Sequence, residues 1–461
     1  MMAEDQSPEG EPEDAYALNA QTVDAILAAI EVGARDRLVT YLEPFHPADI
    51  ADLLEQIGPT ERVRLVKLWG VDLDAEVLSE LEDGVREQIL AVLSEEQLAA
   101  AVNELETDDV VYLVEDLEEP EQERVLDALE DSDRAAVEQL LQYPEGSAGR
   151  MMQRHVVSAP THWSVGDVID YMRASDDLPE QFYDIVIVDP MFKPVGEVRL
   201  GKVMAHPRTV KLSSMMEKDF RTIPVDQSQE DVAYAFNQYH MIQAPVVDEH
   251  GRLVGAITID DAMEVLEDEA EEDMMRLAGL NAEEELSDTV WETTRQRFPW
   301  LAVNLVTAIL ASLVISVFED TISAVVALAV LMPIVASMGG NAGTQSLTVA
   351  VRAIATRDLT GANVWRVVRR EVLAGGLNGL AFAVLMGAIG ILWFGTAQLG
   401  LVIAVAMVIN MIVAGLAGIL IPIGLNRIGA DPALASGAFV TTVTDVVGFF
   451  AFLGLAALIL L

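Results

Sequence analysis

One acidic residue, Asp445, lies in an apolar segment where a charge is energetically unfavourable. Asp445 lies near the middle of an apolar run, and about 24 Å of helix separate it from the last residue. A carboxylate at that depth in a membrane costs about 2.5–3.5 kcal/mol, so it must meet water, a cation or a partner group. Thr441, Asp445 and Gly448 share one helical face, which offers oxygen ligands of the kind that hydrated Mg²⁺ prefers. Neutralisation by a proton or a neighbouring hydroxyl remains the alternative.

A second polar feature interrupts another apolar run. Between Pro333 and Ser346 the sequence reads PIVASMGGNAGTQS, where proline and paired glycines break helices and polar side chains follow. We expect an interrupted helix with exposed backbone carbonyls, which membranes tolerate only beside a cavity or inside protein. A kinked helix with satisfied polar groups is the alternative. The residues that we expect to line a pore are Gly339, Gly340, Asn341, Thr344, Gln345 and Gly448.

The elements that must position these residues are five apolar runs, each long enough to cross about 30 Å of hydrocarbon. The runs are Trp300–Phe318, Thr321–Val351, Val372–Phe394, Leu399–Leu425 and Ala433–Leu461. The arginines between them fall only in the second and fourth connections. By the positive-inside rule these connections are cytoplasmic, as is the N-terminus, and Leu461 lies outside. Five spans seldom enclose a polar pathway, so we expect a homodimer with its pore at the subunit interface.

Charge divides the chain into two unlike halves. The 461 residues carry a net charge of −46. Residues 299–461 balance six arginines against six acids, so the whole excess belongs to the first 298 residues. Such an acidic half repels phosphate backbones, which argues against nucleic-acid binding. The chain contains no cysteine, which excludes disulfides and thiolate chemistry. Residues 1–20 are acidic, unlike a signal peptide, and we expect a disordered tail.

The soluble half divides into a helical and a repeated part. Residues 21–146 show short helical periodicities with acids or Ser/Thr before apolar runs, which predicts a small α-solenoid. Within residues 147–259, an internal repeat relates Ser164 to Ser228 and Val188-Asp189 to Val247-Asp248. Each copy reads helix, strand, turn, strand, an α/β layout that resembles a paired cystathionine-β-synthase (CBS) module.

CBS modules often hold an adenine nucleotide through a Gly-x-x-Thr-x-x-Asp segment. The second copy matches this pattern with Gly255, Thr258 and Asp261, which the resemblance implies as an ATP site. The first copy has Arg199 and Lys202 at the two polar positions, so we expect one nucleotide site at most. A dimerising module without ligand remains the alternative.

A linking helix is expected between the repeat and the first span, over residues 260–297. Met263, Leu266, Ala270 and Met274 form an apolar stripe on an otherwise acidic helix. Two carboxylates 4 Å apart repel by about 4 kcal/mol at an effective dielectric constant near 20, so close approach of many acids needs cations between them. We expect Mg²⁺ to close the soluble domains against the pore, with Asp431 on an inner loop placed to take part.

The order of these parts resembles the MgtE family of magnesium channels and transporters over nearly the whole chain. The stretch from Pro333 to Ser346 and the Thr-Thr-Val-Thr-Asp run ending at Asp445 carry the resemblance most specifically. It implies a homodimeric, multi-pass protein of the bacterial cell membrane whose pore site is Asp445, with Thr441 beside it. It also implies cytosolic Mg²⁺ sites that favour closure, at positions drawn from Asp108, Asp260, Asp261, Glu264, Glu267, Asp268 and Asp431.

The sequence favours a Mg²⁺ channel that imports the ion down its electrochemical gradient and is closed by cytosolic Mg²⁺. A membrane-anchored sensor of adenine nucleotide or cations, without conduction, is the alternative. An enzyme is not expected, because the six histidines are scattered and none lies in a span.

Overall fold

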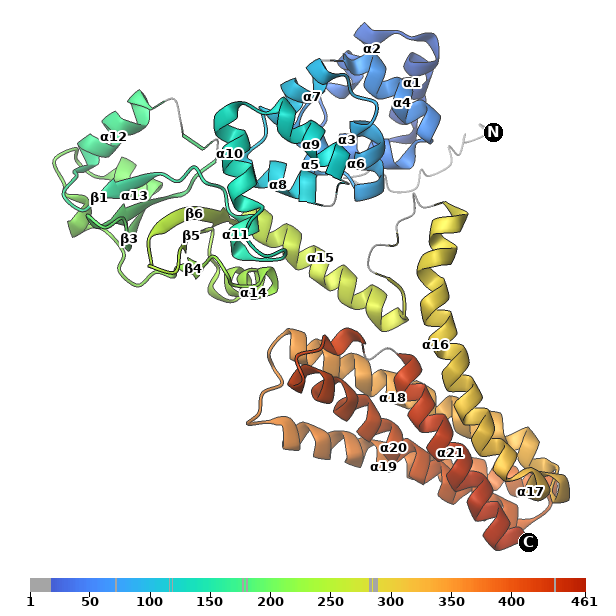
Figure 1. Cartoon of the computed structure of the whole chain (residues 1–461). Helices are drawn as coiled ribbons and strands as arrows, with labels where there is room; N and C mark the ends of the chain where they lie inside the picture. Colours follow the sequence, from blue (N-terminus) through green and yellow to red (C-terminus); the bar gives the residue numbers. More distant parts are fainter. Residues whose placement is uncertain are drawn as a thin grey trace, which may run out of the picture. The chain divides into compact units, whose positions relative to one another are not determined.

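The structure is a computed structural model. It describes residues 18–70, 73–115, 117, 119–175, 178–179, 181–281, 284, 289–434 and 437–461. The chain forms two compact units, Met1–Glu267 and Asp268–Leu461 (Figure 1). Most of the tail expected over residues 1–20 lies outside the described residues.

The first part of unit one is built from short helices, as predicted. They are α1 (Ala20–Val32), α2 (Arg35–Leu42), α3 (Pro47–Gln56), α4 (Pro59–Trp69), α5 (Glu76–Ser79), α6 (Asp83–Leu90), α7 (Glu95–Val102), α8 (Thr107–Glu115), α9 (Glu119–Ala128), α10 (Asp131–Leu140) and α11 (Ala148–Met151). Several of these helices have side-chain caps at their N-termini. At α7, for example, Ser94 and Gln97 form a reciprocal capping box. Leucine, valine and isoleucine side chains from successive helices share one buried core, which gives the stacked arrangement visible in Figure 1.

In the second part of unit one, the described residues form two three-stranded sheets. The first copy comprises β1 (Ser158–Pro160), α12 (Val165–Ala174), β2 (Asp184–Val188), β3 (Pro194–Arg199), α13 (Leu200–Ala205) and the short 3₁₀ helix η2 (Leu212–Ser214). The second comprises β4 (Ile223–Pro224), α14 (Gln229–Tyr239), β5 (Gln243–Val247) and β6 (Leu253–Thr258). In each sheet the first strand pairs parallel to the second, and the second pairs antiparallel to the third. The tandem repeat is therefore confirmed.

The two copies exchange their leading segments. Gln153, before the first sheet, pairs with Ala256 on β6 of the second, and Glu217, before the second sheet, pairs with Glu197 on β3 of the first. Glycine is needed at each crossing. A Cβ on Gly255 would lie 2.7 Å from the carbonyl oxygen of Gln153, and one on Gly196 would lie 2.7 Å from that of Glu217.

The acidic linking helix is shorter than expected. Helix α15 spans Ile259–Ala278 and ends at Gly279, whose positive φ of 77° leaves the helical region. Residues 290–297, which we assigned to its end, lie instead at the start of the first membrane helix, which begins at Val290 behind the Thr289–Glu292 capping box. The expected boundary at residue 297 is therefore corrected.

Unit two contains five helices long and apolar enough to cross a membrane, among the residues that the structure describes. They are α16 (Val290–Val317), α18 (Ala327–Ala355), α19 (Val364–Phe394), α20 (Ala397–Arg427) and α21 (Gly437–Leu460), with short helices α17 (Glu319–Ala324) and η3 (Pro432–Leu434) between them. Helix α20 lies at the centre and packs against α18, α19 and α21. Met407 on α20, Leu331 on α18 and Phe452 on α21 share its buried core. The prediction of a five-helix membrane domain is confirmed.

The expected break in the second spanning helix is wrong. Helix α18 continues through Pro333, Gly339 and Gly340. Close packing explains why: the paired glycines are buried, and their missing side chains admit neighbouring helices rather than ending the helix.

Candidate functional site

Asp445 lies on α21 and is half-buried. One turn earlier, the Thr441 hydroxyl donates a hydrogen bond to the carbonyl oxygen of Gly437 at 2.7 Å, which leaves its oxygen lone pairs available. Arg370 pairs with Glu371 and Arg276 pairs with Asp431, so neither arginine is engaged with Asp445. The arrangement offers a carboxylate and a hydroxyl oxygen on one helical face.

The polar stretch of α18 divides between two faces. Gly340 and Thr344 lie beside α21: a Cβ on Gly340 would lie 2.9 Å from Thr441, and one on Gly437 would lie 3.6 Å from the Thr344 hydroxyl oxygen. Asn341 and Gln345 instead line a cavity of about 440 Å³ with residues of α19 and α20. That cavity also contains Glu371, whose carboxylate accepts a hydrogen bond from Ser346 at 2.9 Å. The pore-lining set predicted from the sequence therefore does not lie on one surface.

Gly339 and Gly448 occupy packing positions, which corrects their assignment as pore-lining residues. Both are buried and face Asn410, a fully buried residue of α20. Asn410 donates a hydrogen bond to the carbonyl oxygen of Val335 at 2.8 Å and so ties α20 to α18. A side chain at either glycine would collide with this amide.

A buried acidic contact lies in unit one between α8 and the start of α15. Asp108 is 8% exposed, and its Oδ1 atom accepts no hydrogen bond from the described residues. Burial raises the pKa of Asp108 well above its usual value, and Asp261 raises it further. Burial, and then Asp260, raise the pKa of Asp261 to about 7. Burial also raises the pKa of Asp109 to about 6. These carboxylates lie in an environment that favours neutralisation by a cation or a proton.

The other predicted regulatory acids are arranged differently. Glu264, Glu267 and Asp268 are exposed on α15, after Ala262, the buried residue of its first turn. Asp431 pairs with Arg276, and its second oxygen accepts a hydrogen bond from the Ala433 backbone amide at 2.8 Å. Within the described part of the chain, no three Asp, Glu or His side chains converge closely enough to form a metal cluster. Sequence reasoning missed Arg276, although it is the single basic residue of α15.

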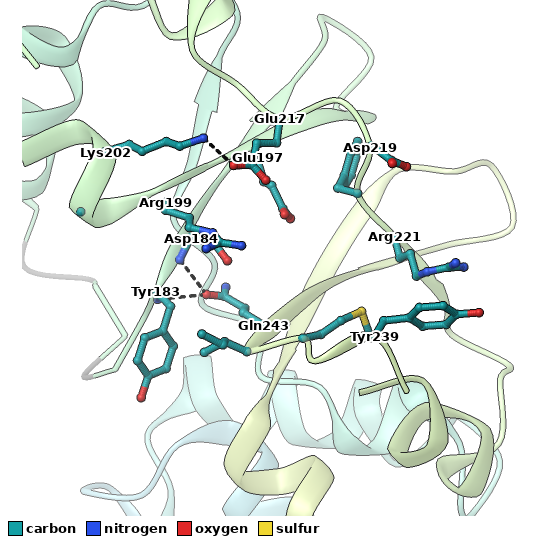
Figure 2. Close-up of a pocket in the computed structure, with 14 residues that line it drawn as sticks. Tyr183, Asp184, Glu197, Arg199, Lys202, Glu217, Asp219, Arg221, Tyr239 and Gln243 are labelled. Carbon is teal, nitrogen blue, oxygen red and sulfur yellow. Dashed lines mark hydrogen bonds and ion pairs between the residues drawn. The ribbon is translucent and has the colours of Figure 1, made fainter. Parts of the chain in front are cut away.

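A cavity of about 710 Å³ lies in the CBS region (Figure 2). Its lining includes Arg199 and Lys202 of the first copy, together with Arg221. Lys202 pairs with Glu217, and the Arg221 guanidinium lies 3.5 Å from the centre of the Tyr239 ring. The Oδ1 atom of Asp184 is buried at this cavity without a hydrogen-bond partner among the described residues.

The nucleotide motif of the second copy does not line this cavity. Thr258 is buried, and its hydroxyl donates to Asp261 at 2.8 Å, which caps the start of α15. Gly255 is required by the crossing of Gln153. These three residues therefore have structural roles in this structure, and the cavity lies at the corresponding positions of the first copy, Arg199 and Lys202.

Comparison with known proteins agrees with this architecture. Residues 332–455 match a family model described as a divalent cation transporter, 45–146 match the MgtE intracellular N domain, and 212–268 match a CBS domain. The Thermus thermophilus magnesium transporter MgtE is 33% identical over 452 residues, covering 94% of this chain and 97% of the relative. Its Bacillus subtilis counterpart is 29% identical over 439 residues, with the same coverage.

One solved structure resembles the soluble half. The crystal structure of the cytosolic domain of the Mg²⁺ channel MgtE in complex with ATP has a TM-score of 0.50 and 30% identity, and covers 53% of this chain and 99% of that chain. The chain is thus a multi-pass membrane protein with an intracellular N domain and a CBS module. It belongs to the MgtE family.

Proposed function

We propose that this chain forms a homodimeric, Mg²⁺-selective channel in the bacterial cell membrane. The observation that carries the proposal is the half-buried Asp445 on a spanning helix, with the Thr441 hydroxyl beside it and Arg276 and Arg370 paired elsewhere. A carboxylate in that place is stabilised by a passing cation. The names of the relatives, magnesium transporters, support Mg²⁺ as the transported substrate. Two copies of Asp445 around a twofold axis would face one hydrated dication with two negative charges.

Voltage supplies enough energy for import. A dication that moves inward through 100 mV gains about 4.6 kcal/mol, which corresponds to more than a thousandfold concentration ratio. No hydrolysis step is needed. The amino-terminal half lies in the cytosol in this proposal, and the C-terminal end of α21 lies outside.

The test removes the negative charge of Asp445 and keeps the shape of its side chain. Purified Asp445→Asn protein in liposomes is expected to lose Mg²⁺ flux by about tenfold or more, because an amide stabilises a dication less than a carboxylate does. The flux is measured with a Mg²⁺-sensitive dye under an imposed membrane potential. Asp320→Asn, an exposed acid on α17, is the matched control and should conduct normally. Undiminished flux in Asp445→Asn would overturn the proposal. Absent flux in the unsubstituted chain, with tight nucleotide binding, would favour a non-conducting sensor.

We also propose that cytosolic Mg²⁺ closes the channel through the buried acidic contact of unit one. Asp108 presents a buried carboxylate oxygen without a hydrogen bond from the described residues, next to Asp261. This donor chemistry fits a hard dication, which would replace repulsion between carboxylates by attraction to a shared ion. At low Mg²⁺ the repulsion favours opening of the contact. The exposed acids Glu264, Glu267 and Asp268 belong to the same acidic helix and are proposed to add to its attraction for Mg²⁺.

ATP is the regulatory ligand that we propose for the CBS cavity. The similar solved structure of a cytosolic domain is a complex with ATP, which supports the same ligand here. In this chain, three basic side chains, Arg199, Lys202 and Arg221, line the cavity and suit phosphate groups. The unpartnered Asp184 oxygen is an acceptor of the kind that binds ribose hydroxyls. Tyr239 also lines the cavity and is 48% exposed, so its ring offers a stacking surface for adenine.

A further inference from the structure

The C-terminal turn of α15 is tied to the membrane domain by one arginine. The guanidinium of Arg276 contacts Glu272, one turn earlier on α15, with one nitrogen, and contacts Asp431 with another. Asp431 stands 155 residues further along the chain, on the loop that leads toward α21. All three side chains are about one-third exposed or less, with 32% for Arg276 and 28% for each acid.

The contact continues into packed residues that adjoin the pore helix. Asp431 also accepts the Ala433 amide hydrogen, which fixes the start of η3. Ala433 is fully buried in a cluster with Leu347 of α18 and Val440 of α21, and Leu277 packs against this cluster. Val440 directly precedes Thr441 in the chain. A movement of Arg276 therefore reaches the segment that carries Thr441 through a short series of direct contacts.

We propose that Arg276 is a built-in cation that holds α15 on the loop before α21, in the place where a Mg²⁺ ion would otherwise be needed between Glu272 and Asp431. Two carboxylates brought together on such a helix repel unless positive charge lies between them. Guanidinium supplies that charge with two nitrogens directed at two acids. We call Arg276 in this role the latch: it holds part of the closed arrangement together without metal. Mg²⁺ is then needed only at the remaining acidic contacts.

The alternative assigns Asp431 to a metal ion, and the two cases predict opposite effects of one substitution. If Arg276 is the latch, Arg276→Gln removes it, and more cytosolic Mg²⁺ is needed for closure. If Mg²⁺ binds Asp431 and Glu272, Arg276→Gln removes a competing cation, and less Mg²⁺ is needed. Asp431→Asn weakens closure in both cases and cannot separate them alone.

The experiment measures Mg²⁺ flux through the full chain in liposomes as a function of Mg²⁺ on the side of the soluble domains. Arg276→Gln is expected to raise the half-closing concentration by about fivefold, as for a partly exposed ion pair. Asp431→Asn should do the same, and the double variant should add little more. The charge exchange Arg276→Asp with Asp431→Arg should restore most of the effect. Arg295→Gln, an exposed arginine on α16 that loses the same charge, is the matched control and should close normally.

A metal-free measurement keeps the inference testable if a variant conducts poorly. The chain has no cysteine, so a cysteine pair can be introduced by Leu277→Cys and Ala433→Cys. Disulfide formation with a mild oxidant then measures how often the end of α15 packs against the cluster that contains Ala433. In chelator, crosslinking should be rapid with Arg276 present and several-fold slower with Arg276→Gln. The inference rests on the proposed closure by Mg²⁺, but the failures differ. Absent flux overturns the channel, whereas a lowered or unchanged half-closing concentration, or crosslinking indifferent to Arg276, overturns the latch.

Discussion

At the scale of single residues, three aspartates show how surroundings decide the use of a carboxylate. Asp445 is half-buried on a spanning helix, Asp108 is buried beside another acid, and Asp431 is held by an arginine. The first two need charge from outside the chain, which makes them candidate cation positions. Asp431 pairs with Arg276, and in our proposal its role is to hold α15 in place.

The carboxyl of Glu197 gives a pH prediction at the CBS cavity. Burial, and then the negative charges of Asp184 and Glu217, raise its pKa to about 7. Below that pH the group is neutral, and above it a carboxylate faces bound phosphates. We expect the affinity of the full chain for ATP to rise as pH falls from 8 to 6. In Glu197→Gln, the affinity should be higher at pH 8 than in the unsubstituted chain, and its dependence on pH should be weaker.

Calorimetric titration of the detergent-solubilised protein with ATP measures this difference. The control is Glu249→Gln, an acid whose side chain is 86% exposed. It should keep the pH dependence of the unsubstituted chain, including any part that comes from protonation of ATP itself. Equal pH dependence in both variants would show that Glu197 does not meet the phosphates.

At the scale of elements, the two CBS sheets hold each other by exchanged edge segments. The amide of Gln153 donates to Ala256 at 2.9 Å, and the amide of Ala256 donates back at 3.0 Å. The absence of a side chain at Gly255 permits this approach. The glycine that sequence reasoning assigned to ATP thus serves the pairing of Gln153 with the second sheet.

Substitution at this crossing should loosen one edge of the second sheet. In Gly255→Ala the new methyl group would collide with a backbone oxygen, which costs about 1–3 kcal/mol and should speed hydrogen exchange of residues near Gln153 by about tenfold. Hydrogen exchange with mass spectrometry measures this locally. Gly201→Ala, where nothing lies within 4 Å of the new atom, should leave the exchange unchanged. Equal protection in both variants would contradict the role of the crossing.

At the scale of the whole molecule, polar side chains remain exposed on the spanning helices. Asn341, Thr344 and Gln345 on α18 are exposed within the single chain, as is Asn378 on α19. Lipid cannot satisfy such groups, so water or another subunit must meet part of this surface. The homodimer that we propose, with a pathway shared between its subunits, would account for their exposure.

Linked dimers test whether the pathway is shared. If two Asp445 side chains face one ion, a tandem dimer with a single Asp445→Asn subunit should lose well over half of the Mg²⁺ flux, because its only pathway carries half the charge. If each subunit conducts alone, half of the flux should remain. Liposome flux, normalised to reconstituted protein, distinguishes the two outcomes. Retention of half the flux would argue against the shared site.

Local patterns in the sequence determined the component parts of this protein. Continuous apolar runs predicted the five spanning helices, since length and hydropathy alone decide whether a segment can cross a membrane. Repeated spacing predicted the paired sheets, because both copies must satisfy the same strand pairing. Acidic, short-period segments predicted the helical domain for a similar reason: helix caps and periodicity act over a few residues.

Tertiary structure decided what depends on partners far apart in the chain. The sequence of α18 does not tell that Gly339 faces Asn410 while Asn341 lines another cavity, because packing chooses the faces of an apolar helix. Nor does it tell that a cavity opens beside Arg199 and Lys202 of the first CBS copy. Arg276 meets Asp431 across 155 residues, and no local rule connects them. Periodicity reports on neighbours within a few turns, whereas ion pairs and cavities form only once the helices have assembled.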